Sequence, residues 1–214
     1  MLPYHPYIGS NNKQNTVFPL EYMYLTQGED GSYSHQGLLA MDFAGWNANG
    51  VVYNCPYYAP CDLELVATPD WNNHIYVYSS INTVNFVDGT TDYFTIMVNH
   101  DNNIYSIGRQ VSQGHILGYT GTYGNGSPSG VGDHVHIEVK KGSWEGLVQN
   151  IYGVWGMKNA DHLYLLFGVN DTVLVVTGGY NWTEFPYTPV PSSSGKNKFP
   201  WVLYANKLRN RNQL

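Results

Sequence analysis

The parts of this chain that suit β-strands are all short, and residues that favour turns close each of them. Runs rich in β-branched and aromatic side chains last only a few residues before Gly, Pro or Asn interrupts them. The clearest are Leu63–Ala67, Ile75–Ser79, Val84–Val87 and Tyr93–Asn99. Short strands between frequent turns are typical of all-β domains, and no segment has the apolar spacing of a long amphipathic helix. The pattern therefore predicts an all-β fold.

The composition supports this prediction and gives a first indication of the surface. The chain has 23 Gly and 11 Pro, which supply turns, and 19 Tyr. Charged residues make up only 12% of the chain, against about 25% in typical soluble domains. A tyrosine-rich polar surface suits peptides or sugars, because Tyr offers contact area and a hydroxyl at little entropic cost. The alternative is that Tyr is simply a good strand former.

The charge is unevenly distributed along the chain. The net charge is −6, but no Asp or Glu follows Glu184, whereas Lys and Arg continue after it. An acidic body argues against nucleic acid as the main partner. The basic end can contact an anionic polymer or a membrane surface, or simply be solvated. Its basic residues are Lys196, Lys198, Lys207, Arg209 and Arg211.

Three further features bound the compartment and the class of site. No apolar run approaches the roughly 20 residues that a membrane-spanning helix needs. The first residues show no basic and then apolar segment of a signal peptide, so we expect none. Cys55 and Cys61 flank Pro56–Pro60, which is a poor zinc signature and leaves open whether the two thiols are bonded.

The segment Val131–Val139 carries the residues best suited to chemistry. It alternates like a strand, which places His134, His136 and Glu138 on one face and the apolar residues between them on the other. Two imidazoles on one rigid strand can bind a metal with one and transfer protons with the other. The alternative is a half-buried strand that carries histidines by chance, so further ligands are needed elsewhere in the chain.

Upstream residues can supply those ligands. A catalytic zinc ion takes three protein ligands and leaves one position open for water. His35 and Asp42 flank a short apolar step, and both can reach one ion. His100 follows the predicted strand Tyr93–Asn99 and begins a turn, so its side chain can point into a cleft. The remaining histidines, His5, His74, His115 and His162, are expected at the surface.

Five segments together resemble a known family. In order along the chain they are His35–Gly37, Asp42–Phe43, Pro56–Pro60, Val111–Gly121 and Gly132–Val139. This ordered set, which covers roughly residues 30–142, resembles the lysostaphin-type zinc endopeptidases that cleave the peptide part of bacterial cell walls. The resemblance implies a twisted antiparallel sheet whose long loops form a substrate groove with zinc at its floor.

The resemblance also implies a role for each candidate residue. His35, Asp42 and His136 would bind one zinc ion (Zn2+), and His134 and His100 would be the two histidines beside it. We expect His134 to assist deprotonation of water and His100 to stabilise the tetrahedral intermediate, although the two could exchange parts. No His-Glu-x-x-His helix supplies a glutamate base instead. The chain departs from the family in having six residues between His35 and Asp42, where three are usual.

Four other residues near the predicted site each allow two interpretations. Glu138 shares a face with His136, so it either orients that ligand or faces solvent. Tyr119, Tyr123 and Trp46 are candidates for contacts to substrate in the groove, or are ordinary aromatic residues of the rim or core.

These inferences predict a domain plan and a function. Residues 1–150 would form the peptidase domain, 151–185 a β-hairpin extension packed on it, and 186–214 a linker and basic tail. The strands of the extension would be Leu163–Val169 and Thr172–Thr177. The substrate would be a stem or cross-bridge peptide of peptidoglycan. We expect a monomeric phage lysin, made in the host cytoplasm and released to the wall by a separate factor. The alternatives are a metal-free protein that binds the wall or activates another hydrolase, and a phage tail-tip peptidase used when the phage enters its host.

Overall fold

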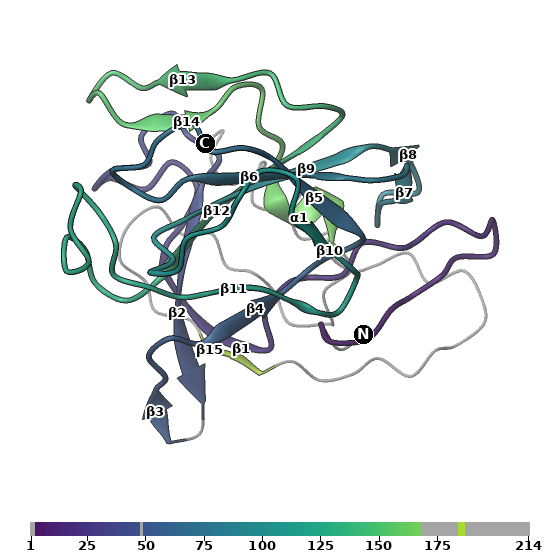
Figure 1. Ribbon diagram of the computed structural model, residues 1–214, viewed down its shortest axis with the longest axis horizontal. Helices are drawn as coiled ribbons and strands as arrows, with labels where there is room; N and C mark the ends of the chain where they lie inside the picture. Colours follow the sequence, from purple (N-terminus) through teal and green to yellow (C-terminus); the bar gives the residue numbers. More distant parts are fainter. Residues whose placement is uncertain (1–2, 48, 168–183, 187–214) are drawn as a thin grey trace, which may run out of the picture.

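A computed structural model describes residues 3–47, 49–167 and 184–186, and these residues form a nearly all-β structure, as predicted (Figure 1). The main sheet has nine strands, and all of its paired neighbours run antiparallel. The strand order is β10-β5-β6-β9-β12-β2-β1-β15, and β3 pairs with β2. These strands are β1 (Tyr22–Gln27), β2 (Met41–Asn47), β3 (Gly50–Val51), β5 (Leu63–Ala67), β6 (Tyr76–Ser80), β9 (Phe94–Asn99), β10 (Gln110–Val111), β12 (Val135–Lys141) and β15 (Glu184–Pro186).

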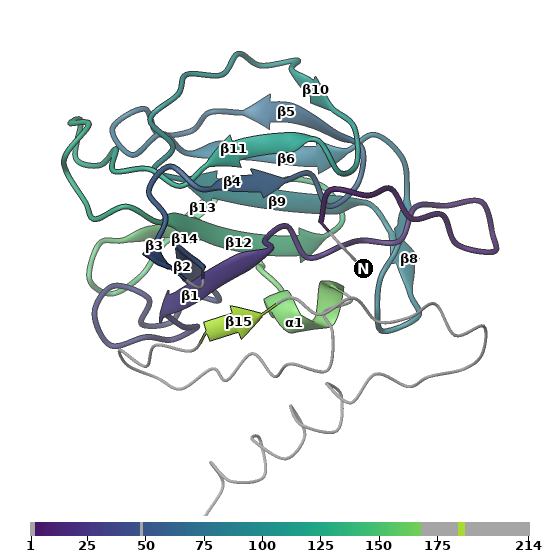
Figure 2. The same cartoon turned by 90° about the horizontal axis from the view of Figure 1, so that it is seen from below.

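Three small two-stranded sheets and one helical turn complete the described structure. The small sheets pair β4 (Pro56–Tyr58) with β11 (Ile116–Tyr119), β7 (Val84–Asn85) with β8 (Thr91–Asp92), and β13 (Leu147–Gln149) with β14 (Trp155–Met157). The helical turn is α1 (Leu163–Leu166). The β4–β11 pair lies against one face of the main sheet and the β13–β14 hairpin against the other (Figures 1 and 2).

The main core lies between the sheet and the β4–β11 pair. Alternation along β12 directs Val135, Ile137 and Val139 into this core, where all three are completely buried. Tyr57 of β4 and Leu117 of β11 belong to the same apolar cluster. Burying large apolar side chains on one face fixes the register of each strand, because a slip of one residue would turn every side chain over.

The opposite face of the sheet carries a smaller apolar cluster and the predicted site. Ile75, Val77 and Met97 pack there with Met157 of β14. Since β12 directs its other residues to this face, His136 lies beside the small cluster. The two faces thus separate the structural core from the residues suited to chemistry.

The C-terminal part departs from the sequence prediction where it is described. The expected strand Leu163–Val169 is wrong in its first part, because Leu163–Leu166 is helical and buries Leu163 and Leu166 in the main core. A short apolar run fits a buried helical turn as well as a strand. The second strand of that expected hairpin, Thr172–Thr177, lies outside the described residues, as do residues 187–214. No helix in the described part of the chain is long and apolar enough to span a membrane.

Asp101 holds together the turn that follows β9. Its carboxylate is fully buried and accepts hydrogen bonds from Asn103 N and Nδ2, from the Tyr105 hydroxyl and from Tyr119 N, each at 2.8 to 2.9 Å. Replacing Asp101 by alanine leaves these donors without their acceptor. We expect the free energy of unfolding to fall by about 3 kcal/mol, measured by urea denaturation. The exposed Asp92→Ala variant is the control, with a change within about 0.5 kcal/mol; equal effects in both variants would contradict this role.

Candidate metal centre

The register of the main sheet brings Asp42 and His136 together. His136 on β12 is the direct partner of Asp42 on β2 and of Asn99 on β9. Paired residues of neighbouring antiparallel strands point to the same face. His136 Nδ1 lies 2.9 Å from Asp42 Oδ1, and both side chains are buried.

His35 reaches the same place from the loop between β1 and β2. The loop turns back on itself through hydrogen bonds from Asp30 N to Leu38 O, 2.9 Å, and from Leu38 N to His35 O, 2.7 Å. His35 Nδ1 donates to Gly28 O at 3.0 Å, which directs Nε2 toward Asp42 Oδ2 at 3.2 Å. The longer spacing between His35 and Asp42 is therefore taken up within a closed loop.

The three side chains fit the requirements of a metal site. Their ligand atoms lie within 4.8 Å of one another. His35 Nε2 is buried and faces Asp42 Oδ2 at 3.2 Å. With Nδ1 donating to Gly28 O, the neutral ring presents a lone pair at Nε2, so a cation between this nitrogen and the carboxylate oxygen would satisfy both atoms. Two imidazoles and one carboxylate are ligands that zinc accepts, with a position left for water. His35, Asp42 and His136 thus form a possible metal site.

The charges around the cluster favour a cation. Burial opposes ionisation of Asp42, but His35 and His134 and the hydrogen bond from His136 hold its pKa well below the ordinary value. Burial also opposes a charge on His136, yet its hydrogen bonds to Asp42 and Glu138 raise its pKa to about 10. Two buried carboxylates on either side of one imidazole therefore require a positive charge between them.

Glu138 is completely buried, so the alternative that its side chain faces solvent is wrong. One of its oxygens accepts from His136 Nε2 at 2.9 Å and the other from Met157 N at 2.7 Å. The first contact leaves Nδ1 of His136 as the nitrogen that faces Asp42. A carboxylate behind a ligating imidazole fixes the tautomer and the orientation of the ring.

Replacing Glu138 by glutamine tests this support. The amide keeps the size of the side chain but puts a donor where two donors already point, so one contact is lost. We expect metal affinity to fall by roughly 10- to 100-fold, measured by competition with a chelator. Glu64, a half-buried residue of β5 that accepts a hydrogen bond from Gln110 Nε2, gives the matched control Glu64→Gln. Unchanged affinity in Glu138→Gln would show that the carboxylate does not support the ligand.

His134 and His100 lie side by side next to the cluster, with ring centroids 4.5 Å apart. His134 Nδ1 donates to Gly132 O at 2.6 Å and His100 Nδ1 to Tyr123 O at 2.8 Å. Each neutral ring therefore presents an unprotonated Nε2, and that of His134 is 3.8 Å from Asp42 Oδ1. Each of these nitrogens therefore offers a lone pair.

His100 is held under constraint at the end of β9. Its φ of 77° lies in the left-handed region, which is uncommon outside glycine and is found at functional sites. Hydrogen bonds from His100 N to Asn73 O and from Tyr123 N to His100 O fix the backbone. Burial, together with His134 and His136, lowers the pKa of His100 to about 3. The ring is therefore neutral near pH 7 and can stabilise an oxyanion only after it gains a proton.

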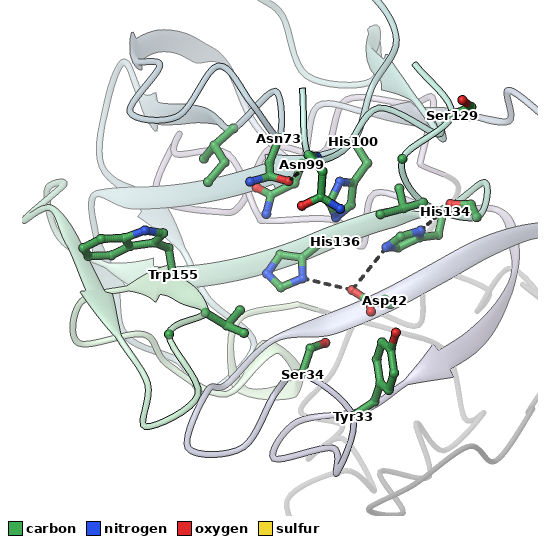
Figure 3. A pocket seen from close by; sticks show the side chains of 17 residues that line it. Tyr33, Ser34, Asp42, Asn73, Asn99, His100, Ser129, His134, His136 and Trp155 are labelled. Atoms are coloured by element: carbon green, nitrogen blue, oxygen red, sulfur yellow. Dashed lines mark hydrogen bonds and ion pairs between the residues drawn. The ribbon is translucent and has the colours of Figure 1, made fainter. Parts of the chain in front are cut away.

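An open cavity of about 720 Å³ exposes these groups to substrate. Figure 3 shows His136 and Asp42 at its centre, His134 and His100 on one side and Trp155 at the far end. Three of the segments that line the cavity are distant from one another in sequence. They are residues 33–34, residues 129–132 and residues 153–155.

The aromatic residues predicted to contact substrate do not line this cavity where they can be placed. Tyr119 and Tyr123 are not among the lining residues. The Tyr123 ring instead stacks on His74, with centroids 3.4 Å apart. His74 is buried, so its expected exposure is wrong. The side chain of Trp46 lies outside what the structure describes.

Several lining residues were not singled out from the sequence. Asn73 and Asn99 lie on the His100 side of the cavity, and Tyr33 and Trp155 on other walls (Figure 3). Asn99 precedes His100 and pairs with His136 across the sheet, so its place next to the site follows once the strand register is known. Trp155 had no such signal, since it follows the segment that carries the family resemblance.

The comparisons with known proteins give relatives in sequence, one of which is a phage protein. No family model matches the chain. Morphogenesis protein 1 of Bacillus phage B103 is 34% identical over 183 residues, which are 81% of this chain and 45% of the phage protein. The chain therefore spans less than half the length of this relative.

Two solved structures of peptidases align with parts of the chain. A zinc containing peptidase from Vibrio cholerae superposes with a TM-score of 0.40 and 15% identity, covering 64% of this chain and 43% of the peptidase. The M23 metalloprotease pseudoalterin superposes with a TM-score of 0.33 and 19% identity, covering 59% and 70%. At such low TM-scores we draw no conclusion from either superposition. The candidate metal site is identified from the geometry of His35, Asp42 and His136 in this chain.

Proposed function

We propose that this chain is a zinc-dependent endopeptidase that hydrolyses peptide bonds in bacterial peptidoglycan. The observation that carries the proposal is the buried His35–Asp42–His136 cluster at the floor of an open cavity. Two further histidines beside the cluster are not needed to bind an ion and remain free for proton transfer. Buried ligand atoms with additional imidazoles beside them are expected of a catalytic metal site rather than of a purely structural one.

His35 Nε2, a carboxylate oxygen of Asp42 and His136 Nδ1 would bind the zinc. When bound, zinc polarises the scissile carbonyl and lowers the pKa of the attacking water toward about 7. The chain contributes the fixed position of the ligands, through Gly28 O behind His35 and Glu138 behind His136. Fixed ligands reduce the reorganisation that the reaction would otherwise need.

His134 is the better placed of the two bases. Its Nε2 is unprotonated in the neutral tautomer and points toward Asp42 at the floor of the cavity. It can accept the proton of the attacking water and return it to the leaving amine. His100 adjoins His134 and can share this proton, in which case it also stabilises negative charge on the carbonyl oxygen. The two parts could be exchanged.

The shape of the cavity fits an extended peptide of small residues. The wall formed by Ser129–Gly132 contains little side-chain volume, and the cavity is open to solvent. An extended chain can lie along such a groove and be read through its backbone. Stem and cross-bridge peptides of peptidoglycan meet this description, and their cleavage would place the activity at the cell wall.

The biological setting has two candidates. The sequence predicts a phage lysin, but the phage relative is called a morphogenesis protein. That name does not describe a lysin. The second candidate is a peptidase carried by the phage particle and used when it enters the host. Detection of this chain in purified particles by mass spectrometry would support the second candidate, and its absence there would support the lysin.

The test of the activity is digestion of purified cell walls from Bacillus and from other bacteria. We expect new amino termini on stem or cross-bridge residues in the released fragments, identified by mass spectrometry, and no cleaved glycosidic bonds. A metal-free protein that binds the wall or activates another hydrolase would bind these walls without releasing fragments. That result would overturn the proposed function.

A further inference from the structure

The candidate ligand His35 lies on a loop, so its position depends on contacts from other elements. Asp42 and His136 lie on paired strands of the main sheet, whereas His35 lies between β1 and β2. The carbonyls on either side of His35 are both bound by one side chain. Asn150 Nδ2 donates to Ser34 O at 3.2 Å and to Gln36 O at 3.0 Å.

Asn150 is itself fixed at the tip of the β13–β14 hairpin. Its Oδ1 accepts from Tyr152 N and from Val154 N, each at 2.9 Å. Its backbone N donates to Val154 O at 2.9 Å. Every polar atom of the carboxamide is therefore engaged, with the acceptor side inside the hairpin and the donor side on the His35 loop. The Asn150 side chain therefore fixes the His35 loop relative to the β13–β14 hairpin.

The same hairpin also contacts the support of the other histidine ligand. Met157 N donates to Glu138, which holds His136. At Gly156 an added Cβ would come within 2.7 Å of Leu38 on the His35 loop and 3.1 Å of both Glu138 oxygens. The hairpin thus packs tightly against the elements that position both imidazoles.

We propose that the β13–β14 hairpin supports the metal centre through Asn150, which is the positioning residue for His35. This inference deepens the proposed function, because it depends on the cluster binding a metal. It assigns a role to residues beyond the segment 30–142 that carries the family resemblance. It also explains how His35 keeps a binding geometry despite the six residues between it and Asp42. Asn150 binds the backbone carbonyls on both sides of His35 from outside the loop.

The test compares the zinc affinities of variants by competition with a chromophoric chelator. Asn150→Asp keeps the acceptor for the hairpin but replaces the donors to the His35 loop by an oxygen that faces two carbonyls. We expect zinc affinity to fall roughly tenfold or more, in the range seen when groups behind metal ligands are removed. Asn150→Ser keeps a short acceptor for the turn but cannot reach Ser34, and it should show the same loss.

Gln149→Ala is the matched control. It removes a hydrogen bond within the same hairpin, from Gln149 Nε2 to Gly153 O, without touching the His35 loop. We expect this variant to bind zinc like the wild type. Wild-type affinity in Asn150→Asp and Asn150→Ser, or an equal loss in Gln149→Ala, would overturn the proposal.

The measurement is independent of hydrolysis, so the two proposals can fail separately. A wild-type chain that binds no zinc would overturn the metal site and the proposed function before any variant is compared. A wild-type chain that binds zinc without cleaving walls would overturn the proposed function alone, and the affinity of the Asn150 variants would still decide the role of the hairpin.

Discussion

Replacing Asp42 by alanine is expected to abolish metal binding and peptide hydrolysis together. Asp42 is the centre of the cluster, with its oxygens 3.2 Å from His35 Nε2 and 2.9 Å from His136 Nδ1. Without the carboxylate, two imidazoles remain beside a buried space that has lost its negative charge. Because metal catalysis contributes several kcal/mol, we expect a loss of at least about 10³-fold in activity. Zinc content by elemental mass spectrometry and the rate of wall digestion measure the two effects.

The control for this variant is Asp92→Ala, which removes an exposed carboxylate of β8. It should retain both zinc and activity. Circular dichroism would check that the Asp42→Ala chain is folded, since the residue also accepts a hydrogen bond from Gln27 at 3.1 Å. A folded Asp42→Ala chain that holds zinc and digests walls at the wild-type rate would exclude this cluster as the catalytic metal site.

Replacing His134 by alanine should lower kcat by about 10²- to 10⁴-fold, the range for loss of a general acid–base. Zinc content should stay unchanged, because His134 is beside the cluster rather than within it. Its Nε2 is 3.8 Å from Asp42 Oδ1, whereas His136 Nδ1 is 2.9 Å away. This combination separates a proton-transfer residue from a ligand, whose removal would reduce zinc content and kcat together.

The control for His134→Ala is His115→Ala, because His115 is exposed and does not line the cavity. It should leave kcat and zinc content unchanged. If His100→Ala lowers kcat and His134→Ala does not, the two histidines have exchanged parts. Full activity in both variants would remove the proposed acid–base function from this pair.

The sequence predicted those parts of the site that depend on one strand. Alternation along β12 places His134, His136 and Glu138 on one face, and that face is where the structure has them. The pairing of β12 with β2, which brings His136 opposite Asp42, is a contact between residues 94 positions apart. The alternation of side chains along one strand cannot predict which strand pairs with it or in what register. Before the structure, only the family resemblance placed His136 and Asp42 together.

The parts that were missed depend on contacts between distant elements. Glu138 is buried because β14 covers it, and no local pattern indicates which segment will lie over a strand. The helical turn α1 was read as a strand because its apolar run has no clear period. For Tyr123 the alternatives were a substrate contact or an ordinary aromatic residue of the rim or core; its carbonyl accepts a hydrogen bond from His100 and its ring stacks on His74. In each case the residue type was informative, and its neighbours decided its function.

Titration of zinc into metal-free chain, with the rate of amino-group release from purified walls as the readout, tests the central claim most directly. The claim is that one zinc ion, bound by His35, Asp42 and His136, makes this chain a peptidase. The account predicts no release from the metal-free chain and a rate that rises linearly and saturates at one zinc per chain. Release at the full rate without zinc, or no release at any zinc content, would contradict it.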